Sequence, residues 1–239
     1  MKNQYFGDTR DLFKYDLILD LLQNSGLSHF VLIPMLTENE PSTHGSRINY
    51  GKANAGVHRV ELRSFLEKCV FENRRNIKEL ENFFRKWKPS KSVKLAIYRV
   101  DDYFSNEKRE EYFSSINIDA LARSVILADP DIGIEVRSMR GKEEKYIRYT
   151  EIRLLYDRMG SQSILLIFQY IPRTSRKQYL SRICNELEKR ITSGFPIHFV
   201  TDSQIVFFIL TKDSNLQRVL KTTLPAYASS YGLDVGTSD

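Results

Sequence analysis

The 239-residue sequence predicts an α/β fold, in which a mostly parallel β-sheet lies between two layers of helices and ends in an antiparallel hairpin. Short apolar runs alternate with longer segments of helical periodicity, which is typical of parallel strands joined by crossover helices. The last two apolar runs are separated only by the polar turn Thr201–Ser203, which predicts the hairpin. The length suits one large domain, so we expect residues 1–239 to fold as a single unit.

The first helix is predicted at 9–23, where apolar residues recur at helical spacing. Asp8 or Thr9 can serve as its N-cap, and Gly26 as its C-terminal stop. The run HFVLIPMLT follows as a buried strand, because it is apolar without a helical period. Residues 41–59 then form a long polar loop, and a loop of that length in an α/β domain is usually functional or disordered.

The middle of the chain continues the alternation. Residues 60–87 read as helix with a break near 72–76, VKLAIYRV as a second strand, 107–121 as a short helix and SVILA as a third strand. The C-terminal part adds a helix in YTEIRLLYDRMG, a strand in SILLIFQYI, an amphipathic helix in SRKQYLSRICNELEKRI, the hairpin in IHFVTDSQIVFFIL and a last helix in SNLQRVLKTTL. Residues 234–239 are expected to fray.

Composition sets broad limits on function. The formal net charge is +6, which suits a polyanionic partner such as nucleic acid. No run of 18 uncharged apolar residues and no apolar leader occurs, so we expect a cytoplasmic protein without a membrane segment. Cys69 and Cys184 lie among apolar neighbours and are expected to be free thiols, and the four histidines lack the spacing of a zinc site.

The stretch RSVILADPDIGIE carries the main functional hypothesis. An apolar strand runs into Asp129 and Asp131, and Glu135 follows after a glycine. Ligands of parallel sheets bind at the carboxyl ends of the strands, where Glu38 also lies after the first strand. Carboxylates that share a site repel one another unless they are protonated or hold a cation. Asp129, Asp131, Glu135 and Glu38 are therefore predicted to hold Mg²⁺ or Mn²⁺, with Lys145 stabilising charge that develops on a phosphate.

A structural interpretation of the same residues stays open. Asp-Pro-Asp is a good turn former, and an aspartate commonly caps the next element. Glu38 could equally be a solvated loop charge.

Two groups of basic residues follow strand ends and could hold a phosphate backbone over that acidic edge. The predicted nucleic-acid-binding residues are Arg47, Lys52 and Arg59 in and after the long loop, and Arg173, Arg176 and Lys177 after the fourth strand. A solvated charged surface is the alternative.

Two resemblances add expectations. The order strand, LADPDIG, helix, strand, helix, hairpin resembles the second half of class I methyltransferases, a Rossmann-like fold in which an Asp-Pro motif follows the fourth strand. The chain has no glycine-rich loop after its first strand; Met35, Leu36 and Thr37 stand where that resemblance implies contacts with S-adenosylmethionine. The motifs YFGD, KY, MLT and DPDIGIE are similar to those of poorly characterised bacterial and mobile-element proteins, which implies a nucleic-acid or defence role.

The sequence therefore predicts a metal-dependent enzyme acting on nucleic-acid or nucleotide phosphodiesters, most simply a nuclease with Asp129, Asp131, Glu135 and Lys145 as its catalytic residues. Two alternatives remain open at this stage. One is a divergent or inactive methyltransferase-like domain, and the other is a non-catalytic, partner-binding subunit of a defence complex.

Overall fold

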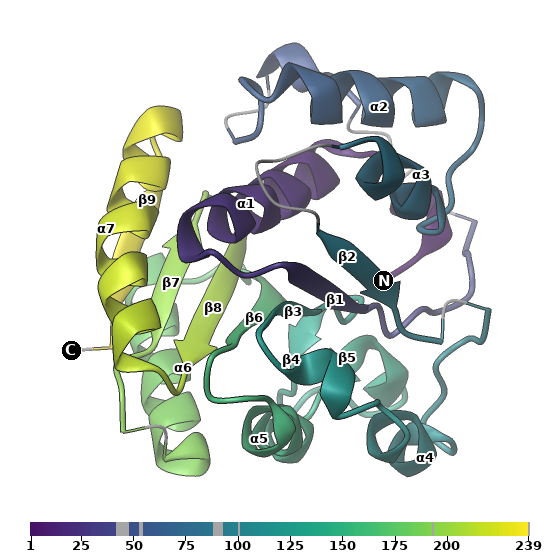
Figure 1. Cartoon of the computed structure of the whole chain (residues 1–239). Coiled ribbons are helices and arrows are strands. Elements are labelled where there is room, and N and C mark those ends of the chain that lie inside the picture. The colour runs from purple at the N-terminus through teal and green to yellow at the C-terminus, as the bar shows by residue number, and fades with distance from the viewer. Residues whose placement is uncertain (42–47, 53–54, 88–92, 100, 193, 239) are drawn as a thin grey trace.

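A computed structural model of the chain describes residues 1–41, 48–52, 55–87, 93–99, 101–192 and 194–238. Its centre is a seven-stranded mixed sheet with four parallel strands on one side and antiparallel pairing on the other (Figure 1). In spatial order the strands are β2 (Lys94–Ile97), β1 (His29–Ile33), β3 (Ser124–Ala128), β6 (Ile164–Tyr170), β8 (Ile205–Thr211), β7 (His198–Thr201) and β9 (Asp234–Thr237).

Parallel pairing joins β2, β1, β3 and β6, and antiparallel pairing joins β6, β8, β7 and β9. The α/β class and the terminal hairpin of β7 and β8 are confirmed. The expectation of a mostly parallel sheet is corrected, because β9 adds a third antiparallel pairing that the hairpin alone would not supply.

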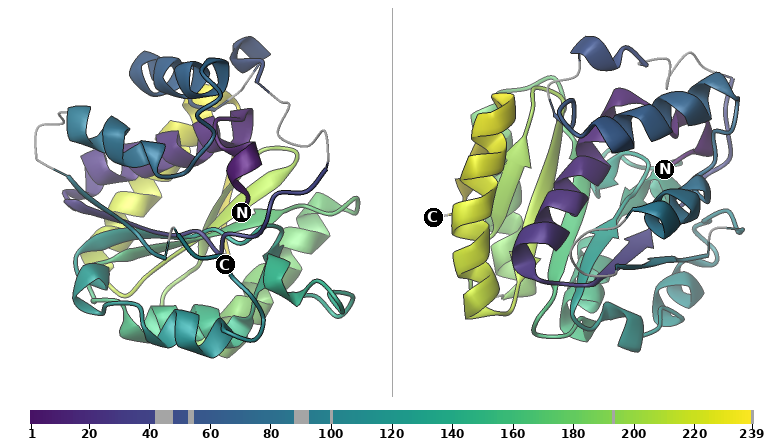
Figure 2. Two further views of the ribbon diagram at one scale, coloured as in Figure 1. Left: turned by 90° about the vertical axis from the view of Figure 1, so that its right-hand side faces the viewer. Right: turned by 45° about the horizontal axis from the view of Figure 1, so that its top comes forward.

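Helices cover both faces of the sheet (Figure 2). One layer contains α1, α3 and α7, with α2 packed against α1; the other contains α4, α5 and α6. Their bounds are α1 (Thr9–Ser25), α2 (Val60–Phe71), α3 (Glu79–Lys86), α4 (Arg109–Ser114), α5 (Tyr149–Arg158), α6 (Arg176–Ile191) and α7 (Ser214–Tyr231). Short 3₁₀ turns are η1 (Asn3–Tyr5), η2 (Tyr50–Lys52), η3 (Asp119–Leu121) and η4 (Glu143–Lys145).

Alternation along the central strands divides the core into two halves. Phe30 and Leu32 of β1 face the α1 side, whereas Val31 and Ile33 face the α5 side. Successive side chains of a strand point to opposite faces, so a strand that is apolar throughout must be covered on both. This is why β3, β6 and β8 read as unbroken apolar runs.

The first helix begins and ends close to the positions predicted. The Asp8 side chain accepts hydrogen bonds from the backbone amides of Arg10 and Asp11, and Gly26 ends α1 with a left-handed φ of 72°. Such an N-cap stabilises a helix by about 1 kcal/mol. Most of α1 is buried, because it lies between the sheet and the neighbouring helices α2 and α7.

Two predictions at the C-terminal end were wrong. The last helix does not stop before Pro225 but continues to Tyr231, where Tyr227 and Ala228 are buried. Residues 234–237 do not fray; they form β9, paired with β7. In both cases packing against the rest of the chain outweighs the local signal.

The predicted loop 41–59 lies partly outside the described residues, namely at 42–47 and 53–54. Its described part packs against the rest of the chain: Tyr50 in η2 is buried, and its hydroxyl donates a hydrogen bond to the carbonyl of Gly7. In the part of the chain that the structure describes, no helix is both long and apolar enough to cross a membrane.

Candidate functional site at the carboxyl edge of the parallel strands

Asp129, at the end of β3, lies in a buried ion cluster with two residues of α1. Its Oδ2 is 2.8 Å from Nζ of Lys14, and the same Nζ is 2.9 Å from Oδ1 of Asp11. The side chains of all three are at most 5% exposed. The sequence prediction had placed Asp129 on a metal, whereas here an ammonium group from the first helix neutralises it.

The electrostatics of this cluster follow from its burial. Burial raises the pKa of Asp129, although the charge of Lys14 acts in the opposite sense. Burial alone would lower the pKa of Lys14, but the carboxylates of Asp11 and Asp129 outweigh it and raise that pKa well above its ordinary value. Lys14 therefore stays charged and holds the two carboxylates in the core.

Asp131, two residues further on, has a different environment. Its side chain is 6% exposed, and its Oδ1 accepts no hydrogen bond from any residue that the structure describes. The nearest amino groups lie beyond hydrogen-bond distance: the α-amino group of Met1 at 3.7 Å from Oδ1, and Lys145 and Lys2 at 3.9 and 4.0 Å from Oδ2. A buried carboxylate oxygen without a hydrogen bond is costly and needs an explanation, which a ligand can supply.

Glu135 does not join either aspartate. Its Oε1 accepts a hydrogen bond from the backbone amide of Tyr149 at 2.9 Å, so the carboxylate caps the start of α5. Negative charge there is favoured by the helix dipole. The predicted trio of Asp129, Asp131 and Glu135 is thus distributed over a core ion cluster, a pocket and a helix end.

Gly133 fixes the path of the chain after Asp131. Its φ of +147° disfavours any side chain, and a Cβ there would lie 2.2 Å from Oε1 of Gln169. That oxygen accepts a hydrogen bond from the amide of Ile134 at 2.6 Å. Gly133–Ile134 is β4, which pairs with β5 (Tyr146–Ile147) in a small second sheet and brings Lys145 to the site.

A pocket of about 270 Å³ opens beside Asp131. The residues that line it are Tyr5, Arg10, Glu40, Asp131, Ile132, Lys145 and Tyr170. The guanidinium of Arg10 lies 4.8 Å from the centre of the Tyr170 ring, and its Nε is buried without a hydrogen-bond partner among the described residues. One pocket therefore presents a buried acceptor on Asp131, a buried donor on Arg10 and two tyrosine rings; we call it the aromatic pocket.

A second, acidic pocket of about 500 Å³ adjoins the aromatic pocket and shares Glu40 and Lys145 with it. Its lining includes four carboxylates against two lysines: Glu38, Glu40, Glu107 and Glu144 against Lys2 and Lys145. Glu40 and Lys145 are paired at 3.3 Å. Burial opposes ionisation of Glu40, but Lys145 and Lys2 together outweigh it and lower the pKa of Glu40 below its ordinary value, so Glu40 is ionised at neutral pH.

Of the predicted metal ligands, Asp131 and Glu38 line these two adjacent pockets, and Asp129 and Glu135 line neither. The described part of the chain contains no group of three His, Cys, Asp or Glu side chains placed to hold a metal ion. The metal site stays a prediction.

Met35, Leu36 and Thr37, the residues expected at an S-adenosylmethionine site, are buried. Their peptide groups form hydrogen bonds within the chain. The amide of Met35 donates to the hydroxyl oxygen of Tyr112 at 3.3 Å, the carbonyl of Leu36 accepts from the amide of Phe104, and the amide of Thr37 donates to the carbonyl of Met1. Thr37 lines the acidic pocket, whereas Met35 and Leu36 line neither the acidic nor the aromatic pocket.

Of the basic residues predicted to bind nucleic acid, the four whose side chains the structure describes line neither of these two pockets. Arg59 pairs with Asp16 at 2.5 Å, and Arg176 pairs with Asp234 at 2.5 Å. Arg173 and Lys177 are exposed. Arg47 lies outside the described residues, and so does the side chain of Lys52.

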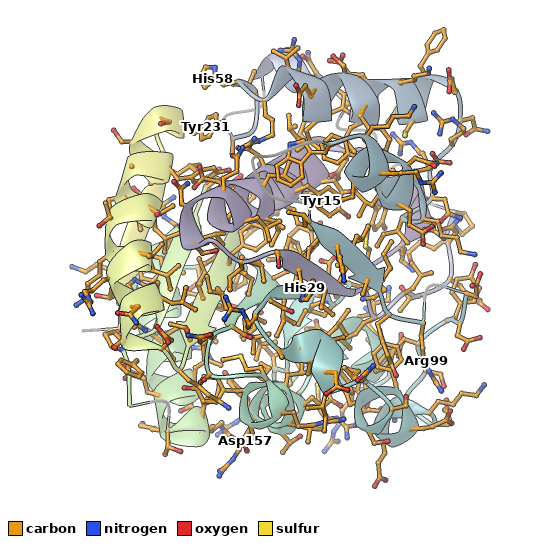
Figure 3. All side chains as sticks on the ribbon, viewed as in Figure 1. Tyr15, His29, His58, Arg99, Asp157 and Tyr231 are labelled. Carbon is orange, nitrogen blue, oxygen red and sulfur yellow. The ribbon has the colours of Figure 1, made fainter. Side chains whose placement is uncertain are left out.

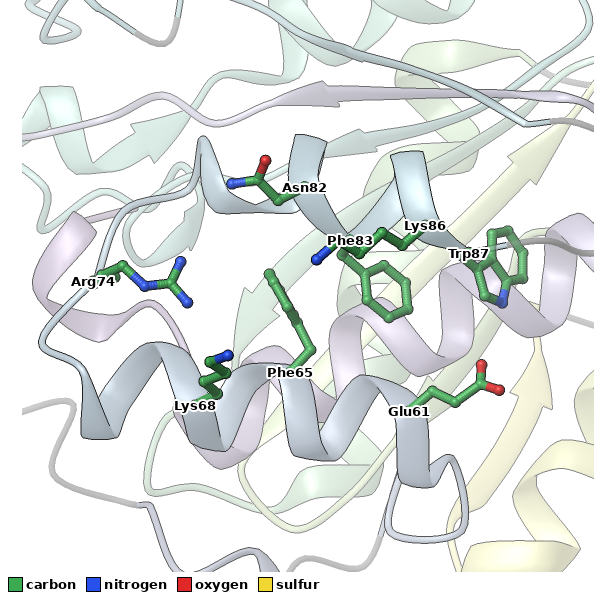
Figure 4. Close-up of a pocket in the computed structure, with 8 residues that line it drawn as sticks. All are labelled: Glu61, Phe65, Lys68, Arg74, Asn82, Phe83, Lys86 and Trp87. Atoms are coloured by element: carbon green, nitrogen blue, oxygen red, sulfur yellow. The ribbon is translucent and has the colours of Figure 1, made fainter.

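A larger cavity of about 640 Å³ lies between α2 and α3, where Phe65 and Phe83 face each other (Figure 4). Its Arg74 is engaged with Glu72 and Glu79. None of its lining residues carries a buried polar atom without a partner, judged over the described residues. His58 lies elsewhere, stacked on Tyr231 with ring centroids 5.2 Å apart (Figure 3).

The sequence prediction missed Arg10, Lys14 and Tyr5 as contributors to the carboxyl edge. A signal was available for Lys14, because a lysine stands among the apolar positions of the first helix, where a buried charge needs a partner. Tyr5 lies within YFGD, the motif that carried the resemblance. Nothing local marks Arg10, whose place depends on how α1 crosses the sheet.

Comparisons of the chain with protein-family models, with curated proteins and with solved structures gave no match.

Proposed function

We propose that the protein cleaves phosphodiester bonds of a nucleotide-containing ligand at the boundary between the aromatic and acidic pockets. The observation that carries the proposal is that the two pockets share the Glu40–Lys145 pair. A ligand that crosses this pair has aromatic and hydrogen-bonding groups on one side and carboxylates on the other. Rings and hydrogen-bonding groups suit a base, and carboxylates suit a divalent cation.

Lys145 is the cation that would contact phosphate. Lys145 is 21% exposed at its side chain and already balances two carboxylates, Glu40 and Asp131. A phosphoryl oxygen placed beside its ammonium group would gain charge stabilisation as the bond breaks. In this assignment Lys145 keeps the role that the sequence predicted, whereas Asp129 and Glu135 become structural.

The donor set of the acidic pocket fits Mg²⁺ or Mn²⁺ bound together with substrate. Magnesium is commonly held by one or two carboxylates and the phosphates of the substrate, without a complete protein cage. Glu40 is the ionised carboxylate beside Lys145, and Glu38 lines the same pocket. The bound ion would polarise the phosphodiester and lower the pKa of a water molecule.

The test is cleavage of end-labelled single-stranded DNA and RNA with and without Mg²⁺ or Mn²⁺. Glu40→Gln should lower the rate by about two orders of magnitude, as expected when one stabilising group is removed. Glu110→Gln is the matched control, because Glu110 is exposed on α4 and lines neither pocket. Absence of metal-dependent cleavage, or an unchanged rate in Glu40→Gln, would rule the proposal out.

A Rossmann-like, methyltransferase-related domain is the second candidate. It is supported by β6, α6 and the β7–β8 hairpin, in which β8 lies antiparallel beside β6. A ligand at one hundred times its Kd stabilises a protein by about 2.7 kcal/mol, so S-adenosylmethionine should raise the melting temperature if this candidate is right. If neither cleavage nor this shift in melting temperature is observed, the non-catalytic subunit of a defence complex becomes the favoured alternative.

A further inference from the structure

We propose that the aromatic pocket selects guanine, with Asp131 accepting hydrogen bonds from N1–H and N2–H₂ of the base and Arg10 donating one to O6. The inference rests on the proposed function, since it names the base at the same site. It starts from two atoms: Oδ1 of Asp131 and Nε of Arg10 are both buried, and neither has a hydrogen-bond partner among the described residues. Both residues line one pocket.

The two side chains have opposite and fixed polarity. An ionised carboxylate only accepts hydrogen bonds, and a guanidinium only donates them. The amino groups nearest to Asp131 lie 3.7 to 4.0 Å from its oxygens, beyond hydrogen-bond distance. Oδ1 of Asp131 can therefore accept hydrogen bonds from a ligand, while Nε of Arg10 requires an acceptor on that ligand.

Guanine is the base whose pairing edge has this pattern. It presents two adjacent donors, N1–H and N2–H₂, followed by the acceptor O6. Adenine and cytosine present one donor beside a ring-nitrogen acceptor, and uracil presents one donor between two acceptors. Each of these would set an acceptor against a carboxylate oxygen and leave a buried group unpaired, which costs about 1–3 kcal/mol.

The remaining walls and the size agree with a base. Tyr5 and Tyr170 supply ring surface, and Arg10 already lies over the Tyr170 ring. Bases that are read along their pairing edge are commonly held against aromatic side chains. The volume of about 270 Å³ is just below the range of about 300–1,000 Å³ typical of small-molecule pockets, which suits one nucleoside. The phosphate of a nucleotide bound in this way would point toward Lys145.

The experiment measures binding of the fluorescently labelled monophosphates of guanosine, adenosine, cytidine, uridine and xanthosine, with EDTA present so that no metal ion contributes to binding. We expect wild-type protein to bind the guanosine nucleotide at least about tenfold more tightly than the other four. Equal affinities, or no binding of any of them, would overturn the inference.

Asp131→Asn provides the sharper measurement. An asparagine presents one acceptor and one donor, which match N1–H and the C2 carbonyl of xanthine. The variant should lose at least about tenfold in affinity for the guanosine nucleotide and gain affinity for the xanthosine nucleotide. Asp157→Asn on α5 is the control, because Asp157 is exposed and does not line the pocket. An unchanged preference in Asp131→Asn would contradict the assignment.

The binding assay separates this inference from the proposed reaction. Guanine-selective binding by a protein that cleaves nothing supports the inference and removes the phosphodiesterase. Metal-dependent cleavage without any base preference supports the phosphodiesterase and removes the inference.

Discussion

Two lysines at the carboxyl edge of the sheet make similar ion pairs in different surroundings. Lys14 contacts Asp11 and Asp129, and its side chain is 5% exposed; Lys145 contacts Glu40 and Asp131, and is 21% exposed. The first cluster is closed by the core, with Phe168 beside the ammonium group at 5.0 Å. The second borders two pockets. The comparison teaches that the DPD motif carries, within three residues, one acid paired in the core and one acid that lines a pocket.

Replacing each lysine by methionine gives the largest effect and the most direct test of that difference. Lys14→Met leaves two buried carboxylates without their cation and should lower the free energy of unfolding by about 3–5 kcal/mol. Lys145→Met should change it by about 1 kcal/mol or less, because water reaches that pair. Urea unfolding measures both. Similar losses in the two variants would abolish the distinction between the clusters.

Gly133→Ala tests whether the loop after Asp131 is held in place by its backbone. The left-handed φ and the contact of a new Cβ with Gln169 should lower the free energy of unfolding by about 2 kcal/mol. Binding in the aromatic pocket should weaken as well. Gly141→Ala is the control: it has a φ of +75° but nothing within 4 Å of the added Cβ, so it should lose about 1 kcal/mol and keep binding. Equal effects would mean that the contact with Gln169 is unimportant.

Asp20→Asn extends the comparison to the other end of α1, where Oδ2 of the Asp20 carboxylate is buried without a hydrogen-bond partner among the described residues. Burial, and then the charge of Asp16, raise the pKa of Asp20 to about 6. Because the folded state binds this proton more tightly than the unfolded chain, the Asp20 contribution to stability falls as pH rises from about 4 to 6.

An asparagine at position 20 does not ionise, so the variant does not lose stability as the pH rises. It should be more stable than the wild type by about 1 kcal/mol at pH 7, after allowance for solvent screening. The melting temperature should rise by about 2–4 °C at pH 7 and by nothing at pH 4. Asp119→Asn, at an exposed position, should leave the melting temperature unchanged at both pH values. A gain in Asp20→Asn that is the same at pH 4 would show that charge is not its cause.

The sequence by itself determined the alternation of helices and strands. The runs HFVLI, SVILA and ILLIFQY are apolar at every position or nearly so, and only a strand covered on both faces requires that. Asp8 and Gly26 marked the ends of α1 through local hydrogen bonding and a left-handed φ. The strand β9 and the last turns of α7 were missed because their stability comes from packing, which no short window of sequence contains.

Only the tertiary structure decided what each acid does. Asp129 and Lys14 are 115 residues apart in the chain, and nothing near Asp129 indicates that its neighbour in space is an ammonium group. Glu135 was grouped with the aspartates because it is close to them in sequence. The chain turns at Gly133, however, and Glu135 lies at the start of α5. Residue type and strand ends locate the acids along one edge of the sheet. The partners that set their charge come from other elements, and they are fixed only when those elements pack.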